Sequence, residues 1–390
     1  MAGSTLAPAI AAVAAAVAFA GAVAAQDRVR IATFNASLSR GGPGVLLKDI
    51  QAGDDPQITA VAEIIRTVRP DILLLNEFDY DGGDAALAAF AALLAQDGAA
   101  PGIDYTHRFS APSNTGQPSG LDLNGDGSTL GPEDAWGFGR FPGQYGMAML
   151  SRFPIDPGES RSFRLLRWAD VPDALLPRQG DAPFPSAAAQ AAMRLSSKSH
   201  WDLAITLPRG SLRVLASHPT PPVFDGPEDA NGRRNHDEIV FWARYLDGWA
   251  VADDAGRTAP IAAAPVVVLG DLNADPRDGD GRHDGIFALL RHPRLQDPAP
   301  SSIGGAVAAA EQGGLNARHR GDPALDTADW RDDSGPGNLR VDYVLPDAAL
   351  TVLDAGVFWP EPGALGAEWV GSGRVVSSDH RLVWVDITQP

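Results

Sequence analysis

Residues 266–275 read VVVLGDLNAD, an apolar run that passes directly into Asp271 and Asn273. Such a run is typical of a buried strand that ends at the rim of a sheet. A carboxylate and an amide at that rim can hold a water, a metal ion and a phosphate oxygen, because Asp supplies charge and basicity while the Asn amide donates and accepts hydrogen bonds. An Asx turn closing a strand explains the same residues more simply, so this stretch alone leaves the function open.

Other apolar runs along the chain also end in, or enclose, polar residues of the kind that phosphoryl chemistry needs. These are RIATFN with Asn35, DILLLNE with Glu77, LRVLASH with His218, LRVDYVL with Asp342, and the final run RLVWVDI, which Asp379 and His380 precede. Ligands collect at strand ends in open α/β sheets. The set therefore predicts one site that folding assembles from the whole chain.

The ordered motifs TFN, NE, SH, GDLN, RVDYVL and SDH resemble the endonuclease/exonuclease/phosphatase superfamily, and they extend from about Val29 to Ile387. GDLN and SDH are specific in this order with the DY strand between them, although each alone is weak. The resemblance implies an α/β fold, a four-layer sandwich of two packed mixed β-sheets with helices outside. It also implies a divalent cation, Mg²⁺ or Mn²⁺, in a cleft at one edge. Two positions depart from relatives: Ser37 replaces the Asp of abasic-site endonucleases, and Asn76 a common Gln.

The resemblance also implies a role for each strand-end residue. Glu77 and Asp379 resemble metal carboxylates, and Asn35 a nearby metal or phosphate contact. In the implied catalytic group, Asp271 orients or deprotonates water, with Asn273 beside it. His380, held by Asp342, is the histidine that stabilises the transition state. His218 is the general acid.

Phosphate esters resist hydrolysis, so catalysis needs charge neutralisation, a positioned water and protonation of the leaving group. The residue set can supply each of these. We therefore predict an exported metal-dependent phosphoesterase that cleaves a phosphodiester by in-line attack of water. Nucleic acid, phospholipid and small phosphodiesters all remain open as substrates. A phosphomonoesterase is the alternative enzyme, and a calcium-stabilised surface or binding protein without catalysis is the alternative from another class.

Two basic pairs are candidate phosphate contacts, Arg233 with Arg234 and Lys198 with His200. The two arginines lie near the start of a predicted helix over residues 231–249, where backbone dipoles favour an anion. Ordinary pairing of each arginine with the acid four residues further on is the alternative. For Lys198 the alternative is a solvated loop residue.

Residues 122–133, DLNGDGSTLGPE, match the template of a calcium-binding loop. The predicted ligands are Asp122, Asn124, Asp126, Ser128 and Glu133. Oxygen atoms at this spacing can surround Ca²⁺, with the final Glu completing the shell. The flanks are rich in Gly and Pro and not helical, so a polar turn is the alternative.

The chain has 390 residues, 44% of them hydrophobic, which is ample for a core. Because the motifs run from end to end, we expect one domain over residues 26–390 and a monomer. A formal net charge of −18 disfavours broad nucleic-acid binding, which depends on many Lys and Arg contacts. The long Gly/Pro/Ala-rich segments 98–144 and 298–338 are predicted to wall the cleft or to stay mobile.

Residues 1–25 resemble a secretory signal: the segment from Leu6 is almost wholly apolar and Ala-rich, and Ala22 to Ala24 form an AxA end. It has no Lys or Arg before the apolar run, and an uncleaved membrane anchor is the alternative. An Ala-rich span gains little from burial in hydrocarbon, so we expect no stable membrane span. The chain has no cysteine, so no disulfide can stabilise it after export. We expect a secreted or periplasmic protein.

Overall fold

The computed structural model describes residues 28–371 and 376–390, so the predicted signal segment 1–25 lies outside the described residues. A first sheet has the strand order β16-β17-β1-β2-β4-β3. Its strands are β1 (Arg28–Leu38), β2 (Ile72–Phe78), β3 (His107–Ser110), β4 (Met147–Ser151), β16 (Val352–Val357) and β17 (Val383–Thr388). The pair β1 and β2 is parallel and its neighbours are antiparallel, so this sheet is mixed.

A second sheet has the order β15-β12-β9-β8-β5. Its strands are β5 (Ile155–Ser162), β8 (His200–Leu207), β9 (Gly210–Ser217), β12 (Val266–Asp271) and β15 (Asp342–Pro346). Only β9 and β12 pair in parallel among these described strands, so this sheet is mixed as well. Small two-stranded ladders join β6 (Arg178–Gln179) to β7 (Ala182–Pro183), β10 (Val251–Ala252) to β11 (Thr258–Ala259), and β13 (Ala328–Asp329) to β14 (Asn338–Leu339).

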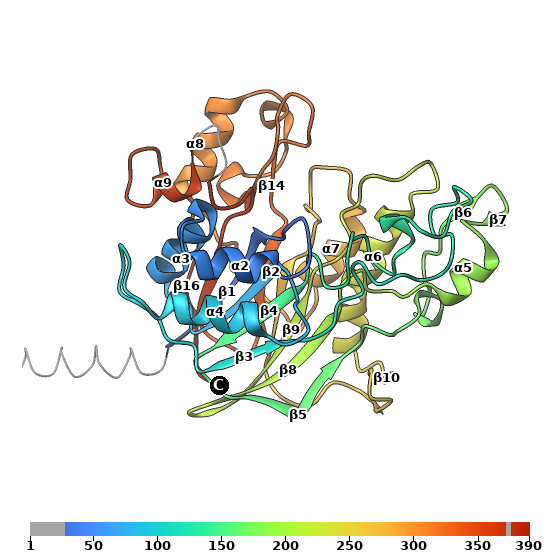
Figure 1. Cartoon of the computed structure of the whole chain (residues 1–390), viewed down its shortest axis with the longest axis horizontal. Coiled ribbons are helices and arrows are strands. Elements are labelled where there is room, and N and C mark those ends of the chain that lie inside the picture. The colour runs from blue at the N-terminus through green and yellow to red at the C-terminus, as the bar shows by residue number, and fades with distance from the viewer. Residues whose placement is uncertain (1–27, 372–375) are drawn as a thin grey trace, which may run out of the picture.

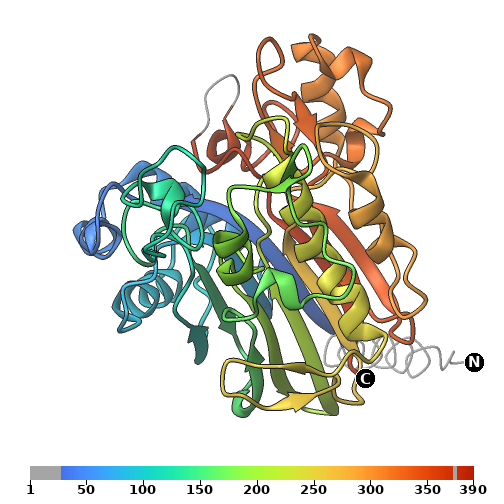
Figure 2. The ribbon, with the colours of Figure 1, turned by 90° about the vertical axis from the view of Figure 1, so that its right-hand side faces the viewer.

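Helices lie over the outer faces of both sheets and in the connecting segments beside them. They are α2 (Val45–Ala52), α3 (Pro56–Val68), α4 (Ala85–Leu94), α5 (Ala187–Ala192), α6 (Ala230–Leu246), α7 (His283–Leu290), α8 (Ile303–Gln312) and α9 (Ala367–Val370), with short 3₁₀ turns at Pro132–Asp134, Trp168–Asp170, Asn316–Arg318 and Pro323–Leu325. In Figure 1, α2, α3 and α4 lie against the first sheet, and Figure 2 shows α6 running across the second. The predicted four-layer α/β sandwich is confirmed. No helix in the described part of the chain is long and apolar enough to cross a membrane.

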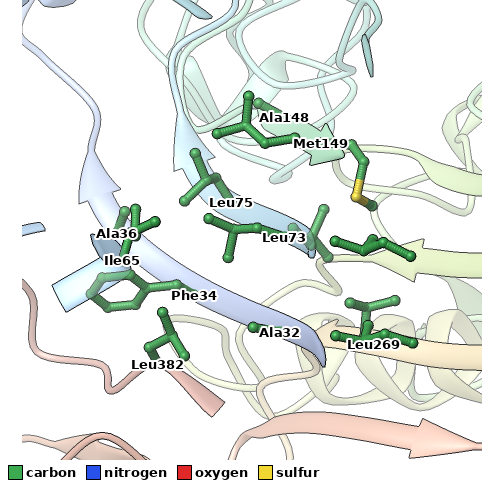
Figure 3. Close-up of a cluster of buried hydrophobic side chains, with 14 of the residues drawn as sticks. Ala32, Phe34, Ala36, Ile65, Leu73, Leu75, Ala148, Met149, Leu269 and Leu382 are labelled. Atoms are coloured by element: carbon green, nitrogen blue, oxygen red, sulfur yellow. The ribbon is translucent and has the colours of Figure 1, made fainter. Parts of the chain in front are cut away.

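The side chains of β12 are all buried and alternate between two apolar clusters, which shows how the two sheets pack. Val267 and Leu269 join the core between the sheets, whereas Val266 and Val268 join a second apolar cluster beneath α6. Successive side chains of a strand face opposite sides, so a continuous apolar run is what a strand buried on both faces requires. Figure 3 shows Leu269 close to Ala32 of β1 in the core.

Local signals fix the ends of α3, which packs on the first sheet. The Asp55 carboxylate accepts hydrogen bonds from the backbone N–H groups of Gln57 and Ile58, and Pro56 occupies the first turn. Both features favour a helix start, because these N–H groups have no partner inside the helix. Arg69 ends the helix in the left-handed conformation, directly before Pro70, and the chain then enters β2.

Candidate active site

The strand register brings the predicted residues to one edge of the two sheets. Asn35 and Glu77 lie near the ends of the parallel strands β1 and β2, and His218 directly follows β9. Asp271 ends β12, which is parallel to β9, and it pairs with Asp342 at the start of antiparallel β15. Parallel strands end at the same edge of a sheet, so residues far apart in the sequence meet there.

The Asp271 carboxylate is the centre of this cluster. Its Oδ2 accepts a hydrogen bond of 2.9 Å from Nδ2 of Asn35 in the other sheet, and its Oδ1 accepts one of 2.9 Å from the Asn273 backbone. The same Oδ2 lies 3.4 Å from Nε2 of His218 and 3.7 Å from Nε2 of His380. Four predicted residues therefore surround Asp271: Asn35, Asn273, His218 and His380.

Burial raises the pKa of Asp271 to about 6, and the nearby charge of Asp342 adds to the rise. The charge of His380 and the hydrogen bonds from Asn35 and Asn273 act in the opposite direction. A carboxylate whose pKa lies just below neutrality is ionised at pH 7 yet basic enough to accept a proton, which suits a general base.

His380 and Asp342 form a buried hydrogen-bonded pair, with Nδ1 2.9 Å from Oδ2. Burial lowers the pKa of His380, but the charges of Asp342 and Asp271 and the hydrogen bond to Asp342 outweigh this and raise it to about 10. The imidazole is therefore protonated at neutral pH, as the Asp342-held histidine requires if it is to stabilise negative charge.

Thr327 and Trp330, which the sequence alone did not identify, contact the pair of Asp342 and His380. Thr327 Oγ1 donates a hydrogen bond of 2.8 Å to Asp342, and the Trp330 ring meets His380 edge-on with 5.2 Å between ring centroids. Trp330 Nε1 also donates to Asp379 Oδ2 at 2.9 Å. Both residues come from the segment 298–338, which was expected to wall the cleft, but no local motif marks either of them.

His218 differs from His380 although both face Asp271. Burial lowers the pKa of His218 well below its ordinary value, and the positive charges of Lys198 and His380 lower it further. Its Nδ1 is buried without a hydrogen-bond partner among the described residues. A general acid needs a proton, so of the two histidines only His380 holds one in this state.

Glu77 and Asp379, the predicted metal carboxylates, are held beside Asp271. Burial raises the pKa of Glu77, and the negative charges of Asp379 and Asp271 add to the rise, while His380 and Lys198 oppose it. Carboxylates crowded at a buried edge are what a hard cation would stabilise, so these residues fit Mg²⁺ or Mn²⁺. When bound, the cation would neutralise charge on the phosphate oxygens.

A different group, Asp271, Asp342 and His380, has ligand atoms within 4.8 Å of one another. This closeness follows from the hydrogen bond between His380 and Asp342. A metal-bound histidine must be neutral, whereas this imidazole is protonated. The imidazole would have to lose its proton to bind a metal in this group, and a cation at Glu77 and Asp379 stays the prediction from the sequence.

The backbone at the site adopts uncommon conformations. Ser37, Glu77 and Asn273 have φ of 51°, 57° and 52°, in the left-handed region that side chains disfavour. At Gly270, φ is 149° and an added Cβ would lie 1.9 Å from the carbonyl oxygen of Ser217. Such strain persists where the surrounding structure fixes it, and it clusters at functional sites. The glycine of GDLN thus lets β12 approach β9 closely.

Lys198 and Arg234 reach a cavity beside Glu77, whereas the other two basic candidates do not line it. The Lys198 ammonium is buried and donates to the carbonyl of Pro219 at 3.4 Å, and burial lowers its pKa. The Arg234 guanidinium donates to three backbone carbonyl oxygens, those of Trp136, Arg194 and Leu195.

His200 and Arg233, the other two basic candidates, make their contacts away from the cavity. His200 is buried, with Nδ1 2.6 Å from Ser196 Oγ and Nε2 2.8 Å from the Glu238 carbonyl oxygen. It packs against the rings of Phe241 and Trp242, so it serves the core beneath α6 and not an anion. Arg233 donates to the backbone carbonyl of Glu228, two residues before α6, and lies 4.0 Å from Asp229. The alternative pairing with the acid four residues further on is not formed.

The predicted calcium ligands do not converge on one point. Both Asp122 oxygens accept backbone N–H groups of the loop, at 2.6 and 2.9 Å, and the oxygens of Asn124 and Asp126 do the same at 3.0 and 2.7 Å. Glu133 lies in the following 3₁₀ turn and lines the cavity beside Glu77. The loop has the form of a polar turn in this conformation, and calcium binding by it stays a prediction from the sequence.

Comparison with known proteins agrees with this fold. Residues 32–380 match the model of the Endonuclease/Exonuclease/phosphatase family, so the chain belongs to this family, whose members are phosphoesterases. No protein in a search of curated sequences matches.

Solved structures of the family resemble the chain at low identity. An endonuclease/exonuclease/phosphatase protein from Beutenbergia cavernae is 18% identical over 93% of this chain and 72% of its own, with a TM-score of 0.51. A mannosyl-6-phosphatase from Bacteroides thetaiotaomicron is 13% identical, covering 93% and 100%, with a TM-score of 0.46. A 3'-5' exonuclease from Neisseria meningitidis is 15% identical over 93% and 100%, with a TM-score of 0.46. At such identity the first of these shows the shared fold, and none of them indicates a substrate.

Proposed function

We propose that this protein is an exported, divalent-metal-dependent phosphoesterase that hydrolyses a phosphodiester by in-line attack of water. The observation that carries the proposal is the environment of Asp271. Its Oδ2 accepts the Asn35 amide and lies within 4 Å of two imidazoles, one of them protonated. The Asp271 carboxylate, as the base, thus lies next to a positively charged imidazole and an amide. Hydrolysis of a phosphate ester requires such a combination.

In the proposed reaction, ionised Asp271 orients the attacking water and takes its proton. The His380 imidazolium, held by Asp342, donates to a phosphoryl oxygen as negative charge develops there. Neutral His218, with Nε2 facing Asp271, can accept from Asp271 the proton taken from water. It can then donate this proton to the leaving oxygen. Each step uses side chains that the sheets already hold in place, so little reorganisation is needed.

The test uses protein that lacks its first 25 residues, with bis-p-nitrophenyl phosphate and p-nitrophenyl phosphate as substrates. We expect turnover of the diester that EDTA abolishes and that Mg²⁺ or Mn²⁺ restores. Asp284→Asn is the control, because this carboxylate is largely exposed and lies outside the cluster. Faster turnover of the monoester would favour the phosphomonoesterase alternative. Metal-independent activity, or no turnover of either ester, would contradict the proposal.

Export rests on the sequence of residues 1–25. Expression of the full chain in a bacterial host, followed by N-terminal sequencing of protein from the periplasm and medium, tests it. We expect the mature chain to begin at Gln26, after the alanine-rich end of the segment at Ala25. Protein that keeps its first residues and sediments with membranes would instead support the uncleaved anchor.

A further inference from the structure

A cavity of about 760 Å³ lies beside the proposed reaction site and shares Glu77 with it. Glu77 and Lys198 line its inner end, and Thr220 lies two residues beyond His218 in its wall. Its remaining wall comes from three segments that follow or connect the strands, residues 115–145, 184–198 and 220–234. The cavity is therefore continuous with the predicted metal carboxylate, and a group attached to a phosphate at Glu77 would extend into it.

The cavity wall is predominantly apolar and aromatic. The large apolar side chains that line it are Leu123, Phe138, Tyr145, Phe184, Met193 and Phe224. Phe224 is 93% exposed and Phe138 is 49% exposed, although both residue types are usually buried. Exposed aromatic side chains gathered around one concavity mark a binding surface for an apolar ligand.

Two aromatic side chains of the wall, Phe138 and Tyr145, are held by contacts within the protein. The Tyr145 backbone N–H donates to Asp79 Oδ1 at 3.1 Å, and the other oxygen of Asp79 accepts the backbone N–H of Arg40 at 2.8 Å. The Phe138 ring stacks on Tyr145, with 6.4 Å between centroids and 30° between planes. A wall that is already ordered loses little conformational entropy when it receives a ligand.

Charge restricts what this cavity accepts. Beyond Glu77, three carboxylates line it, those of Glu133, Asp225 and Glu228. The two cationic side chains of the wall are Lys198, next to Glu77, and Arg234, which donates to backbone carbonyl oxygens. A second anionic group in the outer cavity would therefore meet carboxylates and be repelled.

We propose that this cavity binds the organic substituent of the phosphoester, and that the protein selects substituents that are bulky, apolar or aromatic and free of negative charge. This inference rests on the proposed function and adds a substrate class to it. A polynucleotide, which carries a charge at every linkage, fits this cavity poorly. An ester with a single phosphate and an aryl or alkyl group fits it well.

The first experiment compares p-nitrophenyl phosphodiesters whose second group is methyl, phenyl, octyl or 4-carboxyphenyl, in the presence of Mg²⁺. Relative to methyl, we expect kcat/KM to rise about tenfold or more for at least one of the phenyl and octyl esters, because burial of the larger group favours binding. The carboxyphenyl ester should lose this gain. The ratio of phenyl to octyl distinguishes an aromatic from a lipid-like alkyl substituent.

The variant Phe138→Ala with Phe224→Ala should reduce the preference over methyl several-fold. Glu133→Gln with Glu228→Gln should restore turnover of the carboxyphenyl ester. Leu365→Ala is the matched control, because this side chain is 80% exposed and does not line the cavity. Equal kcat/KM for the methyl, phenyl and octyl esters, or a preference that survives the Phe variant, would overturn the inference.

Binding separates failure of this inference from failure of the proposed function. Titration calorimetry with phenylphosphonate, octylphosphonate and methylphosphonate needs no turnover. Tighter binding of the phenyl or octyl compound, lost in the Phe138→Ala, Phe224→Ala variant, would support the cavity even if no ester were hydrolysed. Equal affinity for all three compounds would overturn it even in an active enzyme.

Discussion

Two acid-rich regions of this protein, the sheet edge around Asp271 and the loop of residues 122–133, resemble metal sites in sequence but differ in structure. At the sheet edge, Asn35 and Asp271 are joined by a hydrogen bond although they lie 236 positions apart. In the loop, side-chain oxygens of Asp122 and Asp126 accept hydrogen bonds from backbone N–H groups of the same loop. Short spacing in the sequence therefore did not bring ligands together, whereas strand ends did.

The physical reason is the number of alternative partners. A loop carboxylate finds nearby N–H groups and forms an Asx turn at little entropic cost. At the sheet edge, Asp271 also accepts a nearby backbone N–H, that of Asn273, but the strands bring the Asn35 amide and two imidazoles to its other oxygen. The comparison gives four predictions, from the largest expected effect to the smallest.

Asp271→Asn should have the largest effect. The amide keeps the shape of the carboxylate but accepts no proton from water, so we expect kcat with Mg²⁺ to fall on the order of a thousandfold. Asp122→Asn in the loop is the matched control and should change kcat less than about twofold. Melting temperatures would verify that both variants fold. Similar losses in the two variants would remove the functional distinction between the regions.

The pair of Asp342 and His380 should behave as one unit. We expect Asp342→Asn and His380→Ala each to lower kcat about a hundredfold, and the double variant to lose little more than either, because the carboxylate acts through the imidazole. The measurement is a double-mutant cycle on kcat. Losses that multiply would show that the two residues act independently.

The raised pKa of His380 predicts that stability depends on pH. Its folded pKa of about 10 lies above the value of about 6.5 for an unfolded chain, so the folded state holds the proton longer. This contribution is complete below pH 6.5 and is lost as the pH rises through 10. Its slope is at most about 1.4 kcal/mol per pH unit for one proton.

Urea unfolding in EDTA between pH 7 and 10 would measure this slope, and His380→Asn should reduce it. The range avoids the pH values below about 6, where Asp271 titrates in the folded protein. An identical slope in the wild type and the variant would show that His380 does not hold its proton.

Calcium should have the smallest effect. Because the loop carboxylates already accept backbone N–H groups, we expect millimolar Ca²⁺ to change the melting temperature by less than about 1 °C. The control is Asp122→Ala with Glu133→Ala, which should respond in the same way. A shift of several degrees that this variant abolishes would show that the loop reorganises around the ion, as its sequence suggests.

The sequence was most informative where burial and chain direction coincide. Runs such as VVVLGD must be buried on both faces, and the polar residue after each run must lie at a rim. That reasoning predicted the strands and the rim positions of Asn35, Glu77 and Asp271, whereas the two-sheet fold was implied by the family resemblance. It was least informative for segment 298–338, where nothing local marks Thr327 or Trp330 as neighbours of His380.

The sequence by itself determined the strands, the family and the residue types at the sheet edge, because periodicity and motif order are properties of the chain alone. Tertiary structure decided which imidazole carries a proton, since the pKa values of His218 and His380 depend on burial and on charges brought from other strands. It also decided that Lys198 faces the cavity while His200 lies in the core, although they are two residues apart. Hydrogen bonds and electrostatic interactions act through space, so their outcome follows from the fold and not from the spacing of residues.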